Sequence, residues 1–405
     1  MTVTRTAQPR LHTALALALG AALALPGCGP LVPLPPVTDS PACPPRVAEY
    51  RVTAMDLSDL EGSILEALNA GASPPPVAEA VRAQGLGAAA GLPFAEADLD
   101  GDGVPEAVVA IVDPSSDPIP AAGALLVLTC RAGAYTPLAR VEGQAGAPIL
   151  HAAIDLNLDQ AAELIVGHPS CGAHTCFERI EAYLWDGAAL AGRLTGDSSD
   201  LPFPEVAIEA AGPDGFPMIA VTGTAIGSAG AGPYRPRTRT WAWSPAEQAF
   251  VPTGETLHPA RQRIHLLHDA DDAARAGDLT TALDLYRRVL ADDSLEDRSP
   301  DDRAALAAYA GFRLMRVHAQ RGEPQAVEAA YAALLAGAPP ESAGRGFAEL
   351  AAAFLEAYWA TGEIRQGCAA AGTYAETYPE RVLLPLDYGY ANRSYTAADL
   401  CPIGP

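Results

Sequence analysis

Residues 98–112, DLDGDGVPEAVVAIV, decide the fold of this chain. Acidic residues occupy alternate positions of a glycine-rich loop, and six apolar residues from Ala107 to Val112 follow directly. Short apolar runs that are bounded by turn residues are typical of buried β-strands. The stretch therefore predicts a tight acidic turn that leads into a strand of the core.

The same pattern recurs along the chain, and a recurring pattern indicates repeated structural units. Residues 155–166, DLNLDQAAELIV, form the second copy, and a weaker third copy runs from Glu209 through Asp214 into residues 218–221. Each copy is followed by a hairpin signal, for example around Asp186-Gly187. Residues 91–257 are therefore expected to form about three antiparallel β units. Each unit would consist of an acidic loop, a buried strand and an outer hairpin.

The flanking parts of the chain have a different residue pattern, typical of helices. Residues 47–90 predict a small α/β segment, with a strand over 48–55 and then two short helices, the first capped by Ser58 and Glu61. Residues 258–380 change to helical periodicity and are rich in Ala and Leu. Turns at Gly277, Gly322 and Gly362 divide them into three helical hairpins, and residues 381–405 form a tail. The predicted fold class is multidomain α+β, an antiparallel β-repeat followed by an α-helical hairpin array.

The N-terminus has the three parts of a secretory signal over residues 1–27: a positive start, an apolar core and a small-residue end before Cys28. The apolar core is about 15 residues, shorter than the roughly 20 that a membrane-spanning helix needs. The stretch Leu25-Pro26-Gly27-Cys28 resembles the bacterial lipobox, in which the cysteine thiol is acylated. This resemblance implies an extracytoplasmic protein held to a cell membrane by a lipid on Cys28, with residues 28–46 as a Pro-rich tether. The alternative is an ordinary signal peptide with a structural Cys28.

Six of the seven cysteines remain once Cys28 is assigned to the lipid, and an even number in an exported chain indicates disulfides. Cys171 and Cys176 bracket a short loop and are expected to pair. The other expected pairs are Cys368–Cys401, in the C-terminal part, and Cys43–Cys130. The alternative is a zinc site at Cys171, His174 and Cys176, for which a fourth ligand at matching spacing is missing.

Composition excludes several classes of function. The chain has 26 Lys plus Arg against 49 Asp plus Glu, a net charge of −23, which argues against nucleic acid and against electrostatic binding to an anionic membrane. Every basic residue is Arg, so a P-loop and a Schiff-base lysine are ruled out. His265 and His268 could share one face of a helix, but no third metal ligand is evident and a structural role is favoured. No catalytic set is apparent, which favours a non-enzymatic protein.

The acidic loops resemble the FG-GAP and VCBS repeats of integrin-type β-propellers. In that family, side chains at loop positions one, three and five, a backbone carbonyl at seven and a carboxylate at nine bind calcium. The resemblance implies a propeller-like domain and two calcium sites. The implied ligands are Asp98, Asp100, Asp102, the Val104 carbonyl and Glu106 in the first loop, and Asp155, Asn157, Asp159, the Ala161 carbonyl and Glu163 in the second.

Calcium chemistry supports this interpretation independently of the family. The ion takes six to eight hard oxygen ligands, and alternate residues of a tight loop can direct several oxygens inward. An EF-hand would need Glu at position 12, where Val109 and Val166 stand. The third loop has lost its ligands and is not expected to bind.

The helical part resembles tetratricopeptide repeats, because each turn Gly is followed by a small residue and, in the first two hairpins, by an aromatic. This resemblance implies a concave face for a protein partner. Together the features predict a calcium-binding, membrane-anchored surface lipoprotein that acts as a protein-interaction scaffold. The alternative is an extracellular hydrolase or carbohydrate-binding lipoprotein, and a deep cleft with converging polar groups would favour it.

Overall fold

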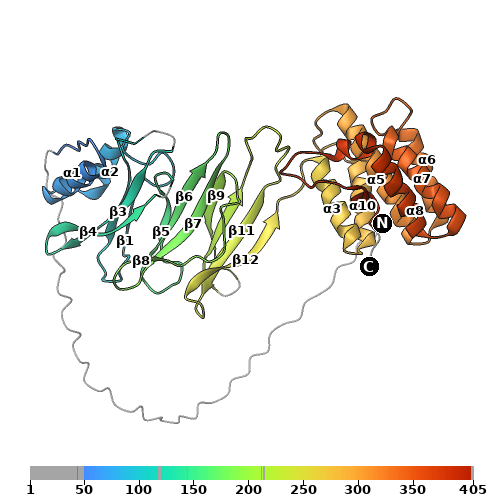
Figure 1. The fold of residues 1–405 in the computed structure, drawn as a ribbon. Helices are drawn as coiled ribbons and strands as arrows, with labels where there is room; N and C mark the ends of the chain where they lie inside the picture. The colour runs from blue at the N-terminus through green and yellow to red at the C-terminus, as the bar shows by residue number, and fades with distance from the viewer. Residues whose placement is uncertain are drawn as a thin grey trace, which may run out of the picture. The chain divides into compact units, whose positions relative to one another are not determined.

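The computed structural model describes residues 43, 50–116, 120–143, 145–210, 212 and 215–402. They belong to one compact unit, Ser40–Pro405. The signal segment 1–27, Cys28 and all of the tether except Cys43 lie outside the described residues. No helix of the described part is long and apolar enough to cross a membrane. The architecture is α+β, with helices at both ends of three antiparallel sheets (Figure 1).

Two helices, α1 (Leu57–Asn69) and α2 (Pro74–Ala83), open the described part of the chain. The predicted strand over residues 48–55 is wrong for residues 50–55, which form no strand although Val52 is buried against the helices and the first sheet. The predicted cap is also wrong. Asp56 is the N-cap of α1 and its carboxylate accepts the Asp59 amide at 2.9 Å, because an Asp one residue before the helix competes effectively with Ser58.

Three four-stranded sheets follow, and each is an antiparallel meander in chain order. In each sheet the acidic loop, or its decayed third copy, joins the first strand to the second, so a short leading strand is present that the sequence did not predict. The first sheet contains β1 (Phe94–Ala97), β2 (Glu106–Val112), β3 (Gly123–Arg131) and β4 (Ala134–Glu142). The second contains β5 (Ile149–Ile154), β6 (Glu163–Cys171), β7 (Cys176–Trp185) and β8 (Leu190–Gly192). The third contains β9 (Pro204–Glu209), β10 (Met218–Gly223), β11 (Arg237–Ser244) and β12 (Ala249–Leu257).

The central strands are buried on both faces. On β2, Val109 and Ile111 pack with α1 and α2, whereas Val108 and Ala110 face the second sheet. On β6, Leu164 and Val166 pack against this face of the first sheet, and Ile165 packs with Ile219 and Trp241 of the third sheet. Strands buried on both faces are continuous apolar runs, which explains why residues 107–112 do not alternate with polar residues.

The third sheet has a different outer face. The face of β10 and β11 that points away from the second sheet carries Ala220, Thr222, Thr238 and Thr240. The hydroxyls of Thr222 and Thr238 lie 2.7 Å apart and are hydrogen-bonded to each other. A face of small and hydroxyl-bearing residues does not require another apolar layer. The described strands form three separate sheets, and these sheets do not close into a ring. A propeller is therefore not seen in the described part of the chain.

All three expected disulfides are present in the structure. Cys43–Cys130 ties the segment before α1 to β3, and Cys171–Cys176 closes the hairpin between β6 and β7. Cys368–Cys401 joins the last long helix to the C-terminal segment. Because Cys171 and Cys176 are bonded to each other, neither is a thiolate that could bind zinc, and the zinc alternative is excluded for this state. Disulfides of this kind are typical of an oxidising, extracytoplasmic environment.

The helical part consists of consecutive antiparallel pairs. The six long helices are α3 (Arg263–Arg275), α4 (Leu279–Ala291), α5 (Pro300–Gln320), α6 (Pro324–Gly337), α7 (Arg345–Thr361) and α8 (Ile364–Thr377), followed by α9 (Pro379–Val382), η1 (Leu384–Leu386) and α10 (Ala397–Leu400). Gly277, Gly322 and Gly362 have φ of 81°, 70° and 74° at the turns within the pairs, a conformation that favours glycine. In the last pair a Cβ on Gly367 would lie 2.8 Å from the Phe354 ring, so the helices approach closely there.

One buried carboxylate organises the polar interior of this helical part. Asp271 of α3 is fully buried and accepts hydrogen bonds from the hydroxyls of Tyr286 (2.5 Å), Tyr309 (3.1 Å) and Tyr395 (2.8 Å). The guanidinium of Arg313, also fully buried, lies 3.3 Å from the same carboxylate. The network therefore joins α3, α4, α5 and the C-terminal segment.

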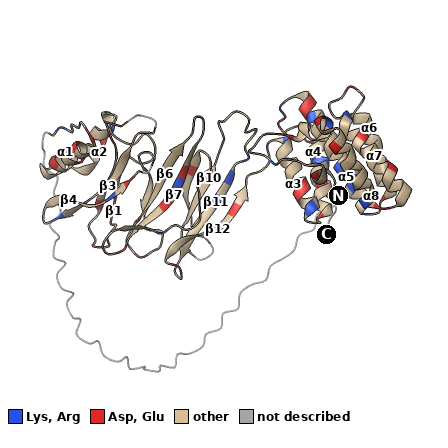
Figure 2. Cartoon of the chain, viewed as in Figure 1, with Lys and Arg blue, Asp and Glu red and all other residues tan. Residues whose placement is uncertain are grey.

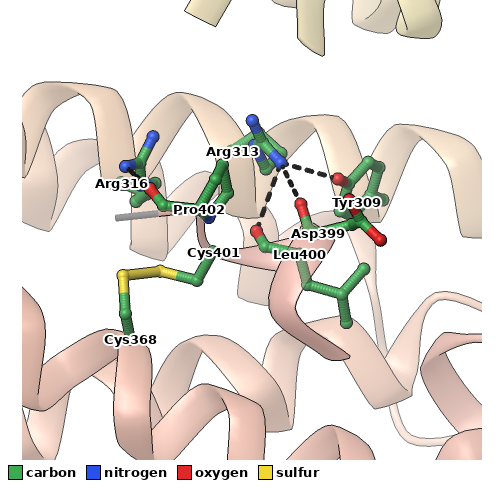
Figure 3. The surroundings of a disulfide bond; sticks show 8 residues. All are labelled: Tyr309, Arg313, Arg316, Cys368, Asp399, Leu400, Cys401 and Pro402. Atoms are coloured by element: carbon green, nitrogen blue, oxygen red, sulfur yellow. Dashed lines mark hydrogen bonds between the residues drawn. A yellow bond between two sulfur atoms is a disulfide. The ribbon is translucent and has the colours of Figure 1, made fainter. Parts of the chain in front are cut away.

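The C-terminal segment is fixed to the helices by arginine side chains as well as by the disulfide (Figure 3). Nη1 of Arg313 donates to the carbonyls of Asp399 (2.9 Å) and Leu400 (3.3 Å). Arg316 donates to the carbonyl of Pro402. The tail up to Pro402 therefore packs back onto the helices, as the expected Cys368–Cys401 pair implies.

Candidate metal centres

Carboxylates gather in the turn between the first two strands of the first and second sheets. In each group, three side chains offer oxygen atoms that all lie within 4.8 Å of one another. The first group is Asp98, Asp100 and Glu106, and the second is Asp155, Asp159 and Glu163. All six residues were predicted as ligands. The repeated sequence therefore folds into a repeated side-chain cluster.

The carboxylate at position nine is the most buried member of each cluster. Glu106 and Glu163 are the first residues of β2 and β6, and their exposed fractions are 0% and 1%. One oxygen of Glu106 accepts the Leu99 amide at 2.8 Å, and one oxygen of Glu163 accepts the Leu156 amide at 2.6 Å. Each of these bonds closes its loop by joining position nine to position two. A Glu reaches the loop amide in both copies.

The carboxylate at position one shapes the backbone of the loop. Asp98 accepts the amides of Gly101 (2.8 Å) and Gly103 (2.9 Å). In the second loop, Asp155 accepts the amides of the equivalent residues, Leu158 (2.6 Å) and Gln160 (3.0 Å). The two loops are therefore hydrogen-bonded in the same way, and position one both orders the turn and belongs to the cluster.

The side chains at positions three and five complete the loops in slightly different ways. Asp102 lies outside the first cluster and accepts the amide of Val104 at 2.8 Å, whereas Asp159, its equivalent, belongs to the second cluster while accepting the amide of Ala161 at 2.9 Å. Asn157 donates to Asp159 at 2.9 Å. The carboxylates of the first cluster thus come from positions one, three and nine, and those of the second from positions one, five and nine, with the Asn157 amide at position three of the second loop.

Burial and charge repulsion make the clusters unfavourable without a cation. Burial, together with the nearby Asp159 and Asp155, raises the pKa of Glu163 to about 7. The pKa of Glu106 is raised, first by burial and then by Asp100 and Asp102. Such shifts mean that a buried negative charge lacks sufficient compensation, and a bound cation would supply it.

One buried oxygen of the first cluster is also left without a proper partner. Oε1 of Glu106 is inaccessible and makes no hydrogen bond of normal geometry. A side-chain hydrogen bond with the Thr129 hydroxyl lowers the pKa of this carboxyl without cancelling the larger effect of burial. Buried acceptors are nearly always satisfied, and a cation beside Glu106 would be one way to satisfy this oxygen.

A basic side chain that the sequence analysis missed contacts the first cluster. Nη2 of Arg131, at the end of β3, lies 2.5 Å from Oδ2 of Asp100. The Asp100 side chain is 4% exposed and that of Arg131 is 56% exposed, so the arginine closes the cluster on its solvent side. The register of the sheet brings Arg131 beside the acidic loop. Neighbouring residues in the sequence do not reveal this register.

The second loop adopts the backbone of the first without its glycines. Gly101 and Gly103 have φ of 74° and 83°, and at the same loop positions Leu158 and Gln160 have φ of 63° and 79°. A left-handed conformation costs a residue with a side chain roughly 1–2 kcal/mol. Strain of this kind is retained where a site depends on the loop geometry.

The remaining predicted positions fall elsewhere. Residues 211, 213 and 214 of the third copy lie outside the described residues, so the structure gives no geometry for that loop. Cys28 lies outside them as well. His265 and His268 are both on α3, far along the chain from the acidic loops, and no metal-ligand group that includes them is found among the described residues.

Loop strain leads to a reciprocal prediction. Gln160→Gly should raise the free energy of unfolding, by somewhat less than about 1 kcal/mol, because the strain that it removes exceeds the extra entropy of glycine in the unfolded chain. The mirror change, Gly103→Gln, should lower the free energy of unfolding by a similar amount, somewhat less than about 1 kcal/mol, because the strain that it adds exceeds the entropy that the unfolded chain loses with the glycine. Denaturant unfolding in the presence of chelator measures both. A Gln160→Gly protein less stable than the starting protein would show that the side chain, not the loop backbone, matters there.

Comparison with known proteins finds no family model that matches this chain and no curated protein with significant sequence similarity to it. The two family resemblances therefore rest on the quoted residues alone.

Proposed function

We propose that this protein is a calcium-binding surface lipoprotein, anchored to a cell membrane through Cys28, that serves as a scaffold for a protein partner. The observation that carries the proposal is the repetition of one acidic loop in two successive sheets. In both loops three carboxylates converge, and the carboxylate at position nine is buried at the base of the loop.

The donor set favours calcium over other ions. All members of both clusters are oxygen donors, and the loops contain no His or Cys that would favour zinc or another transition metal. Two further amide or carboxylate oxygens, from Asn157 and Asp102, lie in the same turns. Calcium accepts irregular sets of six to eight oxygens, whereas magnesium needs a near-ideal octahedron. Extracellular calcium is abundant enough for sites of modest affinity.

The helical part supports the scaffold role through an apolar helix that remains exposed. On α6, Val327 and Leu334 are buried, but most of the outward residues are apolar too, and Leu335 is 38% exposed. A groove of about 340 Å³ runs between α6 and α7 and is lined by Glu328, Tyr331, Ala332, Leu335, Ala352, Leu355 and Trp359. Trp359 is 49% exposed. Exposed apolar patches with a tryptophan are typical of protein interfaces.

The calcium proposal predicts a metal-dependent melting temperature. Millimolar calcium should raise it relative to chelator, because binding to the folded state stabilises by about 2.7 kcal/mol at a hundredfold excess over the dissociation constant. Magnesium should have a smaller effect. Asp100→Asn and Asp159→Asn should each remove part of the calcium-dependent shift, measured by calorimetry.

A matched control is available for the first of these variants. Glu142→Gln removes the same charge from β4 of the same sheet, at a side chain that is 72% exposed, and should leave the calcium-dependent shift unchanged. Equal melting temperatures in chelator and in several millimolar calcium would mean that both loops are acidic turns without a metal role.

The anchoring proposal predicts that Cys28→Ala abolishes metabolic fatty-acid labelling and moves the protein from the membrane to the soluble fraction. The matched control is Cys171→Ala with Cys176→Ala, which removes two thiols that are bonded to each other in the structure. Fractionation of labelled cells separates the outcomes. A Cys28→Ala protein that stays in the membrane fraction would show that the lipid is not the anchor.

The scaffold proposal predicts that one crosslinked complex on native membranes depends on the exposed face of α6 and α7. Trp359→Ala should reduce its yield severalfold, as expected for an aromatic interface residue. Tyr378→Ala, which removes another exposed aromatic outside the groove, should not change it. Complexes that form equally well with both variants would place the partner elsewhere on the chain.

A further inference from the structure

A polar cavity of about 440 Å³ lies where the third sheet, α3 and the C-terminal segment meet. Its walls come from three separate parts of the sequence. Tyr234 and Arg237 belong to β11 and the segment before it, His268 and its neighbours belong to α3, and residues 390–393 belong to the C-terminal segment. The cavity is remote in sequence from the acidic loops and from the groove between α6 and α7.

Backbone contacts hold the walls together. The amides of Tyr390 and Ala391 donate to the carbonyls of Gly230 (3.2 Å) and Ala231 (3.0 Å). The side-chain amide of Asn392 donates to the carbonyl of Pro233 at 3.1 Å, and the His265 ring nitrogen Nε2 lies 3.1 Å from the same oxygen. The cavity is therefore bounded by hydrogen-bonded segments, which is the preformed type of site that small molecules use.

The charged residues of the cavity already neutralise one another. Arg235 lies 2.5 Å from Asp269, Arg237 lies 2.5 Å from Asp200, and Arg393 lies 2.6 Å from Asp272. Figure 2 shows acidic and basic residues on the neighbouring strands β11 and β12, where Arg237 and Arg239 pair with Glu255. An anion or a cation would have to compete with these ion pairs, and the net charge of −23 further opposes an anion.

Hydrogen-bonding groups nevertheless remain unused. Nε2 of His268 and Nη1 of Arg393 are buried without a hydrogen bond. The Tyr234 hydroxyl accepts a hydrogen bond from the Arg237 side chain and keeps its own O–H as a donor for a ligand. Burial lowers the pKa of His268 to about 3, so its imidazole is neutral and can donate or accept. Arginine nitrogens donate only, and a tyrosine hydroxyl does both.

These groups suit a ligand whose own groups both donate and accept without carrying charge. Hydroxyl groups have this property, and a sugar presents several of them on one face and apolar C–H groups on another. The rim supplies apolar surface through Ile226 and Leu257, and the ring of Tyr390 is available for stacking because the residue is 66% exposed. We propose that the cavity between β11, α3 and residues 390–393 binds a neutral saccharide, held by Tyr234, His268 and Arg393 and covered by Tyr390.

This proposal is independent of calcium and of the membrane anchor, and its test uses the whole chain purified from an oxidising host. Isothermal titration and saturation-transfer NMR with a panel of neutral sugars (glucose, galactose, mannose, N-acetylglucosamine, maltose, cellobiose and lactose) measure binding directly. Glucuronate, glucosamine and glycine supply anionic, cationic and zwitterionic comparisons. At least one neutral sugar should bind, and none of the charged compounds should bind more tightly.

Variants locate the site. Tyr390→Ala removes an exposed ring and keeps the backbone contacts, so it should leave the fold intact and weaken binding roughly tenfold, as expected for one stacking contact. His268→Phe keeps the ring packing and should weaken binding by a similar factor through one lost hydrogen bond. Trp359→Ala removes an exposed aromatic ring outside the cavity and should have no effect on sugar binding.

Three results would overturn the proposal. The first is that no neutral sugar of the panel binds, and the second is that a charged compound binds best. The third is that sugar binding is unchanged in a folded Tyr390→Ala protein. Calcium-dependent melting, measured on the same preparation, reports separately on the acidic loops, so the two proposals can fail independently.

Discussion

The burial of β2 and β6 on both faces is the constraint from which the rest of the β part follows. A strand that is apolar on both faces cannot stand at the surface, so each sheet needs a neighbour on either side. Helices α1 and α2 supply the neighbour for the outer face of the first sheet. The threonine-bearing face of the third sheet ends the series because it needs none. The positions of the apolar residues in each strand therefore determine the order of the layers.

The helical part is organised in the opposite way, by a charge in its interior. Asp271 and Arg313 are both fully buried, and three tyrosine hydroxyls complete the coordination of the carboxylate. Removing one partner of a buried ion pair typically costs about 3–5 kcal/mol, because the other charge is left uncompensated. The network also reaches Tyr395, so the C-terminal segment is held by polar contacts that a purely apolar core would not provide. This arrangement brings residues 390–393 next to the third sheet.

Local sequence patterns predicted what depends on local chemistry. The acidic loops, the strands that follow them, the helical turns at glycine and the Cys171–Cys176 pair were all predictable from neighbouring residues. The leading strand β1 was missed because Phe94–Ala97 contains no β-branched residue, and Val52 suggested a strand although it is buried without one. Arg131 beside Asp100 could not be predicted, since a sheet register brings them together. The cavity could not be predicted either, because more than a hundred residues separate Arg237 of the third sheet from residues 390–393 of the C-terminal segment.

One short backbone contact joins the two acidic loops directly. The amide of Ala162 donates to the carbonyl of Asp98 at 2.7 Å, and Ala162 immediately precedes Glu163. Position one of the first loop is thus bonded to the residue before position nine of the second. A cation that orders one loop would fix part of the other, so the second ion would meet a smaller loss of conformational freedom. Two such sites would fill cooperatively, with an occupancy that rises more steeply with ion concentration than that of independent sites, and the paired sheets would respond to calcium as one unit.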